Sequence, residues 1–87
     1  MLSYHKVTLR MRELEHSLVP QSMSYTVPHR ARLDILYWVT ANGVLKSEHE
    51  ILQKIERLKE EMLVLSESDL WYQEKSARIE ELLRVLN

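Results

Sequence analysis

Apolar side chains recur at alternating intervals of three and four residues in two segments, and this spacing constrains the fold most. In residues 2–18 the pattern comprises Tyr4, Val7, Met11, Leu14 and Leu18. In residues 47–65 it comprises Ile51, Ile55, Leu58, Met62 and Leu65. Such spacing places the side chains on one stripe of an α-helix. We therefore predict two amphipathic helices, over residues 2–18 and 47–65.

Helix breakers and capping residues mark the ends of these segments. Pro20 ends the first helix. The apolar residues of 19–27 show no regular spacing, which is typical of a loop. Ser47 and Glu50 form an S-x-x-E capping box at the start of the 47–65 helix. With one glycine and two prolines in 87 residues, the chain has few other places to break.

The segment between the two stripes predicts a third helix over residues 28–42. Pro28 suits the first position of a helix, where its missing N–H removes no hydrogen bond. Residues 35–39 are apolar on every side, so this helix should be the most buried. A strand leading into an Asn42-Gly43 hairpin is the alternative. We favour a helix that ends with Gly43 in the left-handed conformation and with Val44 packed back on its last turn.

The sequence SESD at residues 66–69 leaves two structures open for the C-terminal part. A tight turn at 66–68 would make a hairpin with a helix over residues 68–86. Alternatively, one rod could run from Ser47 onward, because the stripe continues in phase through Tyr72, Ile79, Leu83 and Leu86. Consecutive poor helix formers favour the break.

Together these elements predict an all-α fold, a compact bundle of three or four antiparallel amphipathic helices in a single domain over residues 1–87. We expect the 2–18 and 47–65 helices to pack against each other with the apolar 28–42 helix sandwiched between them. A chain this short builds a marginal core. We therefore also expect self-association, as a homodimer or higher homo-oligomer, with the coiled-coil packing that heptad stripes permit.

Charge divides unevenly along the chain. Residues 1–46 hold six basic and three acidic residues, whereas residues 47–87 hold six basic and ten acidic residues. On the 47–65 helix, Glu50–Lys54 and Arg57–Glu61 have the i,i+4 spacing of surface ion pairs. The adjacent carboxylates at 60–61 and at 80–81 are interpreted as solvent-facing.

No motif of catalytic chemistry is present, so we do not expect an enzyme, a cofactor or a metal. The four histidines, His5, His16, His29 and His49, lack the three- or four-residue spacing of helical metal ligands. With no cysteine and a single glycine, the chain has neither a thiolate site nor a glycine-rich phosphate loop. No apolar run reaches the length of a membrane span, and we expect a cytoplasmic protein.

One local segment could bind an anion. Residues 24–32 combine the start of the 28–42 helix with four candidate ligand-binding residues, Tyr25, His29, Arg30 and Arg32. A helix N-terminus carries partial positive charge, and these side chains could add to it around a phosphate group or a nucleotide. The competing interpretation is that the two arginines pair with the acidic C-terminal helices of the same fold.

The remaining candidates are interface residues, and they favour a protein-binding module or inhibitor. Trp71 and Tyr72 follow the 66–69 break and could anchor a partner protein, as could Tyr4 and Met11 on the first stripe. Trp38 is expected in the core. Nucleic acid is an unexpected partner, because the helix after Gly43 begins with the acidic sequence SEHE. A purely structural assembly protein is the further alternative.

Two stretches resemble a group of known sequences. ARLDILYWV (31–39) and DLWYQEKSARIEELLRVL (69–86) are similar to segments of short helical proteins encoded by tailed bacteriophages. The resemblance covers about a third of the chain. It implies an accessory protein that binds and modifies a host or phage component in the host cytoplasm, and it transfers no site residue.

Overall fold

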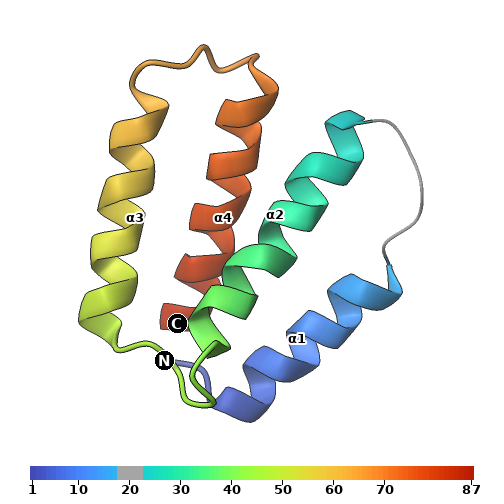
Figure 1. Cartoon of the computed structure of the whole chain (residues 1–87), viewed down its shortest axis with the longest axis vertical. Helices are drawn as coiled ribbons and strands as arrows, with labels where there is room; N and C mark the ends of the chain where they lie inside the picture. The colour runs from blue at the N-terminus through green and yellow to red at the C-terminus, as the bar shows by residue number, and fades with distance from the viewer. Residues whose placement is uncertain (18–22) are drawn as a thin grey trace.

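The structure is a computed structural model that describes residues 1–17 and 23–87, with the side chains of residues 23–25 left out. It contains four helices, α1 (Tyr4–His16), α2 (Met23–Thr40), α3 (Glu48–Met62) and α4 (Leu70–Leu86) (Figure 1). The all-α prediction is therefore confirmed. No helix of the described residues is long and apolar enough to cross a membrane.

Local capping explains where three of the helices begin. The Ser3 side chain accepts a hydrogen bond from the backbone N–H of Lys6 at the start of α1. Ser47 and Glu50 form the reciprocal capping box of α3, as predicted. Each cap satisfies an N–H group that has no partner inside its helix.

The chain breaks between α3 and α4, which confirms the hairpin and excludes the single rod. Asp69 caps α4 by accepting a hydrogen bond from the N–H of Trp71 at 2.8 Å, so α4 starts two residues later than predicted. The break is also longer than the predicted turn at 66–68, because α3 ends at Met62. A short carboxylate that accepts a backbone N–H in this way favours the start of a new helix at the next residue.

The second helix corrects a prediction. It begins at Met23, so residues 23–27 are helical rather than part of a loop, and Pro28 lies inside the helix rather than opening it. A proline near the N-terminus of a helix removes one backbone hydrogen bond, to the carbonyl four residues before it. Pro28 is the sixth residue of α2, just past the first four N–H groups that have no partner inside a helix, so the helix loses one hydrogen bond there. The predicted break at Pro20 and the stripe position Leu18 lie outside the described residues.

At the other end of α2, one prediction holds and one does not. Gly43 has a φ of +77°, the left-handed conformation that favours glycine. Val44, however, is 67% exposed and does not pack on the last turn of α2. Leu45 packs against the core instead, and the N–H of Lys46 donates to the carbonyl of Val39 at 3.0 Å. The chain therefore turns back one residue later than the sequence suggested.

The packing order of the helices also differs from the prediction. The 2–18 and 47–65 stripes do not pack against each other; α2 packs between α1 and α4, and α3 packs on the other side of α4. Consecutive helices run antiparallel, whereas α2 and α4 run in the same direction (Figure 1). The apolar α2 is thus central, as expected, but its second neighbour is α4. It supplies five buried apolar side chains, Ala31, Leu33, Ile35, Leu36 and Val39.

Each of the other helices turns one stripe into the common core. From α1 these are Val7, Met11 and Leu14, from α3 Ile51, Ile55 and Leu58, and from α4 Ala77, Leu82 and Val85. Burying a large aliphatic side chain contributes about 1.5–3 kcal/mol. The start of the chain is tied to the last turn of α4, because the N–H of Leu2 donates to the carbonyl of Val85 at 2.7 Å.

Candidate functional site

A buried carboxylate lies where α1, α2 and α4 meet. Glu81 of α4 is fully buried, and the guanidinium of Arg10 from α1 holds it with two hydrogen bonds, of 2.7 and 3.2 Å. Arg32 from α2 donates to the same carboxylate at 3.2 Å and to Glu80 at 2.6 Å. We call Arg10, Arg32, Glu80 and Glu81 the charged junction. It joins three helices through one acidic side chain.

The electrostatics of the charged junction favour the ionised carboxylate. Burial removes water from Glu81 and on its own raises the pKa of that carboxyl group. The hydrogen bonds and charge of Arg10, with the charges of Arg84 and Arg32, outweigh burial and lower the pKa. The same hydrogen bond raises the pKa of the Arg10 guanidinium. Glu81 is therefore a structural anion rather than a proton donor near neutral pH.

The position of Glu81 corrects the interpretation that residues 80 and 81 face solvent. Glu80 is exposed, as expected, but Glu81 is buried. A glutamate can occupy such a site only because guanidinium groups replace the water it loses. Those arginines come from other helices, 49 and 71 positions away in the chain. No local spacing in the sequence indicates this arrangement.

The arginines of the predicted anion-binding segment form ion pairs within the protein. Arg32 belongs to the charged junction, and Arg30 forms an ion pair with Asp34 one turn along α2, at 3.5 Å. The imidazole Nε2 of His29 lies 2.7 Å from the carbonyl oxygen of Leu14 in α1. The side chain of Tyr25 lies outside the described residues. The structure thus gives two arginines of this segment internal carboxylate partners.

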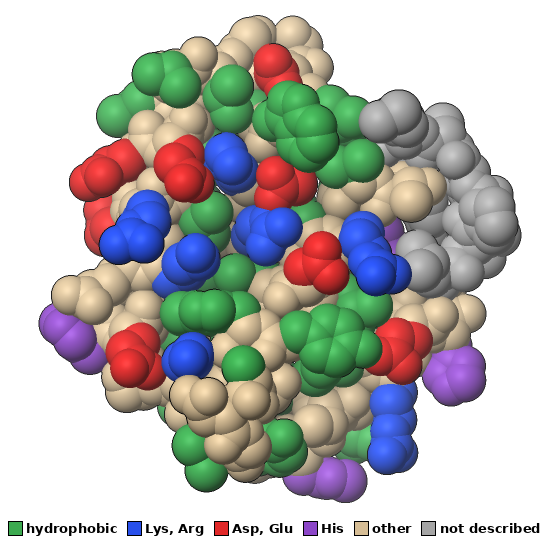
Figure 2. Space-filling model, viewed as in Figure 1, with side chains coloured by type: hydrophobic (Ala, Val, Ile, Leu, Met, Phe, Trp, Pro, Cys, Tyr) green, Lys and Arg blue, Asp and Glu red, His purple; other side chains and the backbone are tan. Residues whose placement is uncertain are grey.

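Three exposed apolar side chains lie at the end of the bundle where α3 turns toward α4, and two of them are the most exposed large apolar side chains of the described residues. Leu63 is 84% exposed, Val64 is 87% exposed, and Trp71 is 53% exposed. Figure 2 shows hydrophobic side chains gathered at this end, at the top of the view. We call Leu63, Val64 and Trp71 the hairpin end. Exposed apolar groups that cluster, rather than scatter singly, mark sites of contact with other molecules.

The α3 side of the hairpin end is acidic. Residues 60–69 include Glu60, Glu61, Glu67 and Asp69 and no basic residue. Basic side chains reach the region from other helices, since Lys75 lies 3.6 Å from Glu61 and Arg30 and Arg78 line a hollow together with Trp71. An apolar centre with an acidic rim is the arrangement that matches an apolar surface surrounded by basic side chains.

The other predicted interface residues are dispersed. Tyr72 is partly buried beside Trp71, and Tyr4 is 40% exposed but lies on α1. Met11 is 8% exposed, so it lies in the core and is not presented to a partner. Of the four predicted residues, the structure therefore brings Trp71 and Tyr72 together at the hairpin end.

Sequence reasoning missed Leu63 and Val64, although a signal was present. Both residues are apolar and both lie off the stripe, which passes through Met62 and Leu65. Apolar residues off the buried stripe of a helix have no core to enter. Their position directly before the 66–69 break places them at an open end of the fold.

Among the described residues, no group of three or more His, Cys, Asp or Glu side chains is arranged to hold a metal ion. No family model matches this chain, and no curated protein or solved structure matches it.

Proposed function

We propose that this chain is a non-enzymatic helical module that binds a partner protein through the hairpin end. The single observation that supports this is the exposure of Leu63, Val64 and Trp71 on one end of the bundle. Tryptophan is enriched among the residues that dominate binding energy at protein interfaces, and aliphatic neighbours exclude water around it. In this account, regular structure ends there and leaves the apolar side chains available.

The acidic rim specifies the partner further. We propose that the partner presents an apolar recess bordered by lysine or arginine side chains. A second copy of the hairpin end would bring Glu60, Glu67 and Asp69 against their own copies, and this repulsion opposes a symmetric dimer at that surface. The expected self-association would use another face. Binding and modification of a host or phage component, which the bacteriophage resemblance implies, is one biological use of such a module, and inhibition of a host factor is another.

A variant pair tests this function. The double variant Leu63→Ser/Val64→Ser removes the aliphatic part of the hairpin end. Leu52→Ser is the control, because Leu52 is an exposed leucine of α3 outside the hairpin end. Each protein is immobilised and exposed to lysate of its native cell, and the retained proteins are quantified by mass spectrometry.

We expect at least one protein that the unmodified chain and the Leu52→Ser control retain equally. The double variant should retain about tenfold less of it, the loss expected for about 1.4 kcal/mol of binding free energy. Retention should weaken in high salt, because salt screens the attraction between the acidic rim and the basic side chains of the partner. Retention of the same proteins in equal amounts by the unmodified chain, the double variant and the control would contradict the proposal. Loss of a homodimer in the double variant, measured by native mass spectrometry, would also contradict it by identifying a second copy as the occupant.

A further inference from the structure

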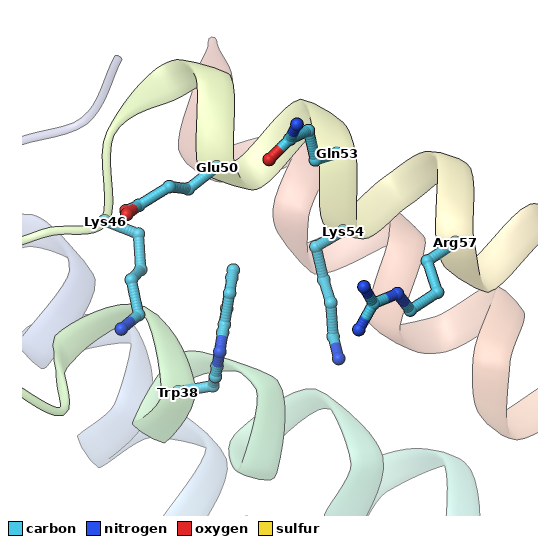
Figure 3. A pocket seen from close by; sticks show the side chains of 6 residues that line it. All are labelled: Trp38, Lys46, Glu50, Gln53, Lys54 and Arg57. Atoms are coloured by element: carbon cyan, nitrogen blue, oxygen red, sulfur yellow. The ribbon is translucent and has the colours of Figure 1, made fainter.

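A second surface lies between α2 and α3, away from the charged junction. Trp38 of α2, Lys46 of the connecting loop and Lys54 and Arg57 of α3 line a cavity of about 180 Å³, together with Glu50 and Gln53. We call this cavity the Trp38 pocket. Figure 3 shows the indole between Lys46 on one side and Lys54 and Arg57 on the other.

Both lysines contact the aromatic ring. The ammonium of Lys46 lies 5.3 Å from the ring centroid of Trp38, and that of Lys54 lies 5.5 Å from it. Attraction between a cation and an aromatic face contributes about 0.5–1 kcal/mol at exposed sites. These contacts hold the two charges in place but do not neutralise them. Trp38, which was expected in the core, packs against the core but is only partly buried, so its ring is accessible to the two ammonium groups.

The carboxylates expected to neutralise this surface are used elsewhere. The predicted pairs Glu50–Lys54 and Arg57–Glu61 are not among the ion pairs of the described residues. The Glu50 carboxylate accepts the N–H of Ser47 in the capping box, at 3.0 Å. Glu61 lies 3.6 Å from Lys75 of α4.

As a result, the basic residues of the Trp38 pocket form no ion pair with an acidic group of the described residues. Seven of the twelve lysines and arginines form ion pairs with described residues. Three of the other five, Lys46, Lys54 and Arg57, line this one cavity. Lys54 and Arg57 are neighbours at i,i+3 spacing on α3, where like charges repel. An anion bound between them would relieve this repulsion.

From this geometry we infer that the Trp38 pocket binds a phosphomonoester dianion. With the three cations and the single carboxylate of Glu50, the lining carries a net charge of +2, which a dianion neutralises. Arginine supplies a planar donor set that matches phosphate oxygens, and lysine adds a point charge. The cavity can enclose the phosphate group itself, while the rest of the ligand extends outward. This inference is independent of the proposed protein contact at the hairpin end.

The two tryptophans allow a direct test. In a Trp71→Phe background, Trp38 is the single tryptophan, so its fluorescence reports on the pocket. This protein is titrated with glycerol phosphate, a phosphomonoester that does not absorb at the tryptophan wavelengths, with sodium chloride added to keep ionic strength constant. We expect a saturable change in Trp38 emission. Sodium chloride alone at matched ionic strength should give no such change.

Two further proteins in the same background complete the test. Lys54→Gln/Arg57→Gln should bind at least about tenfold more weakly, because the loss of a charge-assisted hydrogen bond alone weakens binding by about that factor. Arg12→Gln, which removes an exposed cation of α1 that forms no ion pair with described residues, should bind within about twofold of the background protein. Circular dichroism confirms that each variant is helical. Saturation that survives in the double variant, an equal response to chloride, or no saturation in the background protein would each overturn the inference.

Discussion

The charged junction and the hairpin end differ in which groups they bury: the junction buries charged groups, and the hairpin end exposes apolar ones. At the junction a carboxylate is fully buried, and guanidinium groups from two other helices surround it. At the hairpin end Leu63 and Val64 are more than four-fifths exposed. Burying charge is costly and exposing aliphatic groups gains nothing for folding. Stabilisation of the fold thus explains why the charges of the junction are buried, because they tie three helices together. It does not explain why the apolar side chains of the hairpin end are exposed.

The comparison separates a structural cluster from a surface available for binding. Every charged group of the junction has a partner inside the protein. At the hairpin end, by contrast, Leu63 and Val64 bury little of their surface within the chain. A substitution at the junction should therefore change stability, and a substitution at the hairpin end should change binding alone.

The largest expected effect is at Glu81. Glu81→Gln keeps the size of the side chain but leaves Arg10 and Arg32 without the buried anion between them. We expect the free energy of unfolding to fall by about 3 kcal/mol, since removing one partner of a buried ion pair strands the other charge. Urea unfolding followed by circular dichroism measures the change.

Glu80→Gln is the control for this prediction. Glu80 is the adjacent glutamate and binds the same Arg32, but its side chain is 57% exposed. Its substitution should lower the free energy of unfolding by less than about 1 kcal/mol, as is usual for surface ion pairs. Equal losses in the two variants would contradict the structural role assigned to Glu81.

The second effect is the pH dependence of that difference. Folding lowers the pKa of Glu81, so its ionised form stabilises the fold at all pH values above the ordinary pKa of glutamate. The contribution is lost as the pH falls through the lower pKa of the folded protein. The stability gap between the unmodified protein and Glu81→Gln should therefore be widest near neutral pH and narrow in acid. A stability gap that widens in acid would contradict a pKa of Glu81 that is lowered by folding.

The smallest expected effect on stability is at the hairpin end. Leu63→Ser/Val64→Ser replaces two largely exposed side chains, and each surface substitution should change the free energy of unfolding by no more than about 0.5 kcal/mol. Thermal and urea unfolding measure this. A loss of several kcal/mol would mean that these side chains support the fold, and the comparison between the two regions would then fail.

Much of the fold was predictable because its signals are local. The capping box at Ser47 and the left-handed Gly43 depend on neighbours within a few residues, and both were predicted correctly. Pro28 shows the limit, since a proline near a helix start can occupy more than one position. The pairing of α2 with α4 depends on side chains far apart in the chain, and no periodicity within one helix reveals it.

The candidate site was predictable only in part. Trp71 was identified because an aromatic residue directly follows the 66–69 break. Leu63 and Val64 have the same hydrophobicity as buried residues, so their exposure depends on where the bundle ends. The expected ion pair Arg57–Glu61 is absent among the described residues for a similar reason, because Glu61 pairs with Lys75 of another helix. The pair Glu50–Lys54 is absent for a local reason, because Glu50 accepts the N–H of Ser47 in the capping box.

The most direct test of the central claim is to place a photo-crosslinking amino acid at the hairpin end in the living cell. The probe replaces Val64 in one protein and Leu52, an exposed residue of α3, in another. We predict that position 64 forms a discrete covalent adduct with a partner protein on irradiation and that position 52 does not. An absence of adducts at position 64, or the same adducts at both positions, would contradict a binding role for the hairpin end.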